Sequence, residues 1–195
     1  MKTTTTTLPP QLTLNINLTD EAFFQLCQNN RDLRFERTAA GELIIMPPTG
    51  SDTGNRNFDI AVELGIWNKQ TKLGKGFDSS TGFKLPNGKD VSPDVAWIKK
   101  EHWDSLTSEQ QNKFAPIAPD FVIELRSSSD NLKPLQEKMQ EYIDNGVKLA
   151  WLIDRKQRKV FIYRPNCVVE ELDHPQTLTG EDLLPGFVLD LSQIW

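Results

Sequence analysis

The stretch PDFVIELR at residues 119–126, together with SPDVA at residues 92–96, decides the fold of this chain, because each places a carboxylate in a strand-like apolar run. Side chains of a strand alternate between its two faces, so Glu124 and Arg126 share one face. Asp94 begins the other run, after a proline that cannot donate a ladder hydrogen bond. Acids in such places need a charged partner or a chemical role.

Two interpretations stay open from these residues alone. In the first, Glu124 and Arg126 form a partly buried ion pair and Asp94 caps a turn, so that all three charges are structural. In the second, both carboxylates belong to a site at a strand start, edge or bulge, where a side chain can be re-aimed. The segment that follows favours the second interpretation.

A helix is predicted from about Lys133 to Asn145, with Pro134 in its first turn and Gly146 as its stop signal. At helical spacing one face consists of Leu135, Lys138, Met139, Tyr142 and Ile143. Lys138 can lay its methylenes on apolar surface and keep its ammonium in water. Because a short loop joins the strand to this helix, Lys138 can instead lean back toward the carboxylates.

Two acids and a cation that converge at strand ends are the groups used in metal-assisted hydrolysis of a phosphodiester. Carboxylate oxygens hold a hard divalent ion, and the ion activates water and neutralises developing charge. The lysine would orient the water or stabilise the negative charge on the phosphate.

The motifs extend over most of the chain: SPDVA at 92–96, PDFVIE at 119–124, a serine-rich bend, EKMQEY at 137–142, and a segment from Gly146 to Asp154. This arrangement resembles the Uma family of bacterial endonucleases, formerly a domain of unknown function. That family lies in the restriction-endonuclease-like superfamily with the Pro-Asp…(Asp/Glu)-x-Lys signature. The resemblance implies an α/β (α+β) fold with a restriction-endonuclease-like mixed β-sheet flanked by helices. The sequence itself adds an N-terminal hairpin around Ala40-Gly41.

The resemblance also implies a site in which Asp94 and Glu124 hold Mg²⁺ or Mn²⁺ and DNA is the substrate. The superfamily's lysine, two residues beyond the second acid, is Arg126 here. The pKa of arginine is too high for a proton-transfer base, although arginine can clamp a phosphate. In the family this role is thought to lie on the following helix, which makes Lys138 the catalytic candidate.

A third acid from an early helix is common in the superfamily, and the candidates are Asp52 and Glu63. We expect Asp52 to be the additional metal ligand. It also has a structural explanation, because an Asp at a helix start accepts hydrogen bonds from unpaired backbone N–H groups. Glu63 lies at the margin of the apolar face of its helix, where a solvated surface acid is the ordinary interpretation.

Composition limits the alternatives. The chain has 195 residues, of which 37% are hydrophobic and 25% charged, and this predicts a flexible lead over 1–17 and a single restriction-endonuclease-like domain over 18–195. No apolar run is long enough to span a bilayer and no secretory signal is evident, so we expect a cytoplasmic protein. Two distant cysteines fit neither a metal site nor a disulfide framework. The net charge of −5 argues against a general nucleic-acid coat protein.

The sequence therefore predicts a metal-dependent endonuclease that hydrolyses phosphodiester bonds of DNA, with Asp94, Glu124 and Lys138 as its catalytic residues. The alternative is a noncatalytic nucleic-acid-binding or accessory module that retains the nuclease fold, and Arg126 keeps this alternative open. The apolar tail that ends at Trp195 can dock on the body or on a second subunit. A homodimer would place two sites on the two DNA strands.

Overall fold

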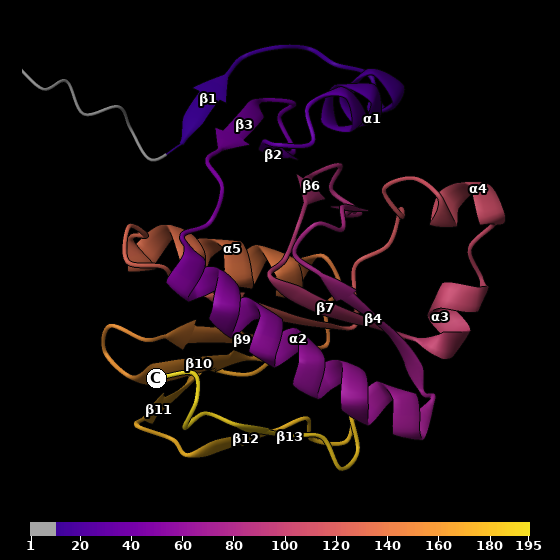
Figure 1. Ribbon diagram of the computed structural model, residues 1–195. Helices are drawn as coiled ribbons and strands as arrows, with labels where there is room; N and C mark the ends of the chain where they lie inside the picture. Colours follow the sequence, from indigo (N-terminus) through magenta and orange to yellow (C-terminus); the bar gives the residue numbers. More distant parts are fainter. Residues whose placement is uncertain (1–10) are drawn as a thin grey trace, which may run out of the picture.

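The computed structural model describes residues 11–195, so the first ten residues of the expected lead lie outside the described residues. Runs of short strands are separated by helices along the sequence (Figure 1). The helices are α1 (Asp20–Asn29), α2 (Ser51–Thr71), α3 (Lys100–Asp104), α4 (Ser108–Gln111) and α5 (Leu132–Asp144).

The central sheet has six strands in the order β11-β10-β9-β8-β7-β4. They are β4 (Gly74–Asp78), β7 (Val95–Lys99), β8 (Phe121–Leu125), β9 (Leu149–Asp154), β10 (Lys159–Tyr163) and β11 (Glu170–Asp173). β8 and β9 are parallel, and the other neighbours are antiparallel. A parallel pair needs a crossover connection, which α5 provides between β8 and β9. The sheet is mixed, as the sequence predicts.

A second sheet lies with α1 at one end of the molecule, at the top of Figure 1, and has the order β1-β3-β2-β6-β5. Its strands are β1 (Leu12–Leu14), β2 (Arg34–Arg37), β3 (Leu43–Met46), β5 (Phe83–Lys84) and β6 (Asp90–Val91). β2 and β3 form the expected hairpin, in which Gly41 takes a φ of 88°. β1 falls within the expected lead and pairs with β3. The division into a lead and one domain stays a prediction.

Helices cover both faces of the central sheet. The face under α2 is a buried cluster that includes Ile60, Leu64, Trp67, Val95, Phe121, Ile123 and Trp151. The face under α5 is a second cluster that includes Ala96, Val122, Met139, Tyr142, Ala150 and Leu152. The alternation along β8 therefore directs even-numbered residues, Glu124 among them, toward α5. This arrangement confirms the expected sheet flanked by helices.

The C-terminal segment packs on the α2 face of the body. It contains a two-stranded sheet of β12 (Thr177–Thr179) and β13 (Val188–Asp190). Its buried side chains belong to the cluster beneath α2, and they include Leu184, Phe187, Leu189, Leu191 and Ile194. A homodimer stays a prediction. From residue 11 onward, no helix has the length and apolar character needed to cross a membrane.

Candidate active site

Glu124 and Lys138 meet between β8 and α5. Glu124 is the fourth residue of β8 and is buried, and Lys138 lies in the middle of α5. The Lys138 Nζ is 2.9 Å from Glu124 Oε1, and the Tyr142 hydroxyl, one helical turn later, donates to the same oxygen at 2.8 Å. Lys138 therefore leans back toward the carboxylate rather than extending into water.

Asp94 is fixed beside Glu124 by two hydrogen bonds. It precedes β7, and β7 pairs with β8, so that both acids lie at one end of adjacent strands. The backbone N–H of Leu125 donates to Asp94 Oδ2 at 2.9 Å. From α2, the Asn57 amide donates to Asp94 Oδ1 at 2.9 Å. The two acids predicted from the sequence are thus brought together.

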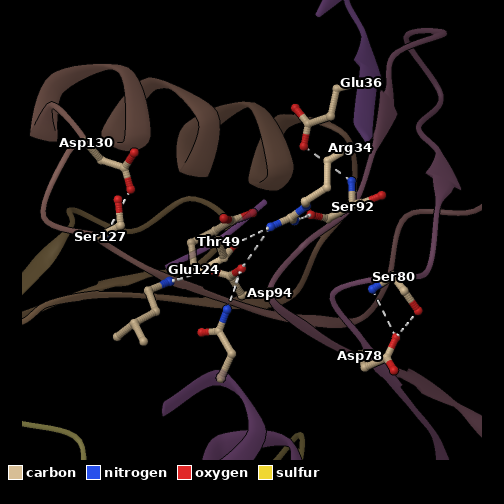
Figure 2. A network of polar contacts seen from close by, with 12 residues as sticks. Arg34, Glu36, Thr49, Asp78, Ser80, Ser92, Asp94, Glu124, Ser127 and Asp130 are labelled. Atoms are coloured by element: carbon tan, nitrogen blue, oxygen red, sulfur yellow. Dashed lines mark hydrogen bonds and ion pairs between the residues drawn. The ribbon is translucent and has the colours of Figure 1, made fainter. Parts of the chain in front are cut away.

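Strand β2 of the second sheet adds two charged side chains to this site. Arg34 and Glu36 are two residues apart, so both point from one face of β2. The Arg34 guanidinium donates to the carbonyl oxygen of Ser92 at 3.2 Å and lies 3.8 Å from Asp94 Oδ1 (Figure 2). Glu36 Oε1 lies 2.9 Å from the Lys138 Nζ. The site is therefore shared between both sheets, α2 and α5.

Burial dominates the electrostatics of the carboxylates. It raises the pKa of Glu124 to about 7, opposed by Lys138 and reinforced by the charges of Asp94 and Glu36. Burial also raises the pKa of Asp94, although the hydrogen bond from the Leu125 N–H and the charge of Arg34 act to lower it. For Glu36, burial acts to raise the pKa, but Lys138, Lys89 and the Ser92 N–H together hold this pKa below its ordinary value. The site thus holds more buried negative charge than its lysine compensates.

The donor set fits a hard divalent cation. Asn57 Oδ1 is buried beside Asp94 without a hydrogen-bond partner among the described residues. Both contacts of Glu124 fall on Oε1, so Oε2 takes part in neither. Within residues 11–195, no group of three or more His, Cys, Asp or Glu side chains is arranged to hold a metal ion. Two carboxylates suffice for Mg²⁺, which usually keeps several waters.

The other sequence candidates lie apart from this cluster. Asp52 is exposed in the first turn of α2 and pairs with Arg155 at 2.7 Å and Arg56 at 3.1 Å. Its role as a metal ligand stays a prediction. Glu63 is exposed on the same helix.

Arg126 does not pair with Glu124. Its guanidinium donates to Asp154 Oδ2 at 2.6 Å and to the carbonyl oxygen of Asp130 at 3.2 Å. Asp154 is fully buried, so this contact neutralises a carboxylate at the end of β9. The structural interpretation of a Glu124–Arg126 ion pair is therefore wrong.

Sequence reasoning missed Glu36 and Asn57. Glu36 lies in a strand predicted only as part of a hairpin, and its partner Lys138 is 102 residues away. Asn57 carried a detectable signal: it is a polar residue in register with the buried face of α2, which comprises Thr53, Asn57, Ile60, Leu64 and Trp67. A polar side chain in an apolar stripe indicates a buried partner.

Comparisons with known proteins agree with this architecture. A solved structure from Anabaena variabilis ATCC 29413, described as "a putative nuclease belonging to DUF820", is similar with a TM-score of 0.66 and 21% identity. The match covers 82% of this chain and 87% of that chain, and it shows a shared fold. Comparison with curated proteins gives no match.

The fold is thus of the restriction-endonuclease-like class. The model of the Uma2 family, described as "Putative restriction endonuclease", matches residues 20–192, and the chain belongs to this family. The resemblance drawn from the sequence motifs is confirmed.

Proposed function

We propose that this protein is a metal-dependent endodeoxyribonuclease that hydrolyses phosphodiester bonds of DNA. The observation that carries the proposal is the contact of the largely buried Lys138 ammonium with Glu124 at 2.9 Å, beside an Asp94 carboxylate that accepts from the backbone N–H of Leu125. Two acids and a largely buried cation at one end of two adjacent strands are the groups that phosphodiester hydrolysis needs. Family membership supports a nucleic-acid substrate.

Asp94 and Glu124 would hold the ion, Mg²⁺ or Mn²⁺. When bound, that ion supplies charge neutralisation and activation of water. Asn57 orients Asp94 through its amide and leaves its own Oδ1 open toward a water or the ion. Tyr142 fixes the Glu124 carboxylate by donating its hydroxyl proton. Lys138 is held charged, because its pKa is raised well above the ordinary value by Glu124 and Glu36 against the effect of burial.

A charged Lys138 cannot act as a proton acceptor, so its role is electrostatic. Its ammonium carries three donors, and two carboxylates occupy part of this capacity. We infer that the remaining donor capacity orients the attacking water or stabilises negative charge on the phosphate. The arginine at the superfamily's lysine position takes no part, because it binds Asp154.

The test is nicking of supercoiled plasmid with Mg²⁺ or Mn²⁺, with EDTA as the metal-free control. Asp94→Asn, Glu124→Gln and Lys138→Met should each lose roughly 100-fold or more of the rate with the fold intact by circular dichroism. Glu42→Gln, in the β2–β3 hairpin, is the matched control and should nick like the wild type. Unchanged nicking by Asp94→Asn and Glu124→Gln would refute the assignment.

Calorimetry with the metal alone separates this proposal from the noncatalytic module that the sequence left open. An enzyme should bind Mg²⁺ or Mn²⁺ and lose that binding in Asp94→Asn. A module that retains only the fold has no reason to bind the ion at these carboxylates.

A further inference from the structure

Glu36 is a buried carboxylate of the site that helps to keep Lys138 charged but has no place among the proposed metal ligands. Only 5% of its surface is exposed, although it comes from β2 of the second sheet rather than from the central sheet. Its Oε1 lies 2.9 Å from the Lys138 Nζ and accepts from the backbone N–H of Ser92 at 3.3 Å. Ser92 precedes Asp94 by two residues, so Glu36 is linked both to Lys138 and to the segment that carries Asp94.

Lys138 is held between two anions from different sheets. Its Nζ is 2.9 Å from Glu124 Oε1 on β8 and 2.9 Å from Glu36 Oε1 on β2, and it lies 5.7 Å from the centre of the Tyr142 ring. A lysine side chain has a flexible four-carbon stem and loses considerable rotamer freedom when it is fixed. Two anchors on separate elements define the position of its ammonium better than one.

The two anchors differ in what else they must do. Glu124 is a proposed metal ligand, and a carboxylate that binds a divalent cation holds an ammonium less strongly, because the two cations repel each other. Glu36 is tied to Ser92 N–H and faces Lys138. We propose that Glu36 is the positioning residue that keeps the Lys138 ammonium in the site while Glu124 binds the metal ion. This inference rests on the proposed nuclease function.

The alternative roles for Glu36 make different predictions. If Glu36 were itself a metal ligand, its removal would weaken metal binding directly. If it formed only a structural ion pair, its removal would lower stability without a selective effect on Lys138 in the metal-bound protein. The test therefore measures metal affinity, the Lys138 ammonium and the rate separately.

The experiment compares the wild type, Glu36→Gln and the control Glu42→Gln in the full chain. The ¹⁵N-labelled Lys138 ammonium is followed by NMR with and without Mg²⁺, Mg²⁺ affinity by calorimetry, and plasmid nicking at saturating Mg²⁺. In the wild type and the control, the slowly exchanging ammonium signal should persist in both states. In Glu36→Gln it should persist without Mg²⁺, when Glu124 still holds the lysine, and disappear with Mg²⁺.

The nicking rate of Glu36→Gln should fall roughly tenfold to 100-fold, while its Mg²⁺ affinity stays within about threefold of the wild type. If Glu36→Gln does not fold, Glu36→Asp, shorter by one methylene, replaces it in the same comparison. A signal that survives Mg²⁺ in the variant, or a Mg²⁺ affinity reduced tenfold or more, would overturn the positioning role while leaving the nuclease proposal intact. A wild type that binds neither Mg²⁺ nor Mn²⁺ would overturn both.

Discussion

Replacing Glu124 with glutamine should make the metal-free protein more stable at pH 8 while abolishing its response to Mg²⁺. Burial raises the pKa of this carboxyl from 4.5 to about 7. A carboxyl with a raised folded-state pKa contributes stability that is fully present below pH 4.5 and is lost as the pH rises through 7. The rise in pKa corresponds to a loss of about 3 kcal/mol in the unfolding free energy of the wild type at pH 8. Glutamine has a similar shape and no charge to desolvate.

The gain is smaller than this figure because glutamine weakens the contact with Lys138. The lysine keeps Glu36 as a partner at 2.9 Å, so it is not left as an unpaired buried charge. Tyr142 can still donate its hydroxyl proton to the amide oxygen. We therefore expect a net stabilisation of about 1–2 kcal/mol at pH 8, which corresponds to several degrees in melting temperature.

The assay is urea unfolding of the wild type, Glu124→Gln and Glu42→Gln at pH 5 and pH 8 in EDTA. The difference between Glu124→Gln and the wild type should move in favour of the variant by about 2.5 kcal/mol between pH 5 and pH 8. At pH 5 the folded wild type already carries a neutral Glu124. A difference that stays constant with pH would show that folding does not raise the pKa of Glu124, and the reasoning from burial would be refuted. Added Mg²⁺ should raise the stability of the wild type and leave the variant unchanged.

The plasmid-nicking rate of Arg126→Lys should stay within about threefold of the wild-type rate, because Arg126 contacts Asp154 at 2.6 Å rather than the site carboxylates. A nicking rate reduced tenfold or more would contradict this. Gly74→Ala should lower the unfolding free energy by about 3 kcal/mol in urea, because a Cβ there would lie 2.2 Å from the carbonyl oxygen of Ile98. Gly76→Ala, on the same strand with nothing within 4 Å, is the control and should leave the urea midpoint nearly unchanged. Equal midpoints for both alanine variants would rule out the close approach of the two strands.

The sequence predicts the parts of the site that depend on local periodicity. The helix expected at 133–145 is α5 at Leu132–Asp144, shifted by a single residue. Its 3.6-residue period puts Lys138 on the buried face, and the two-residue period of β8 puts Glu124 on the face under that helix. These two periods, combined with a short strand-to-helix connection, are enough to bring an acid and a lysine together.

The remaining contacts depend on how whole elements pack, which no local pattern encodes. Asp52 illustrates this, because an acid near a helix start is consistent with a ligand, a cap or an ion pair. Its partner Arg155 lies 103 residues away and is brought near by the packing of the elements. Glu36 is likewise placed by the way the second sheet meets α5. Neither pairing could be read from spacing.

The charge balance of the site gives the most general reason to infer a bound cation. Asp94, Glu124 and Glu36 are each at most 9% exposed; Lys138 contacts Glu124 and Glu36, and the partly exposed Arg34 lies 3.8 Å from Asp94. A site selected only for stability would replace such a cluster with apolar residues, because buried ion pairs seldom repay their desolvation. Three buried acids with one lysine and a partly exposed arginine are instead the arrangement expected where a divalent ion completes the balance. Burial, reinforced by the charges of Asp94 and Glu36, raises the pKa of Glu124, so metal binding and proton release at this carboxylate should be coupled.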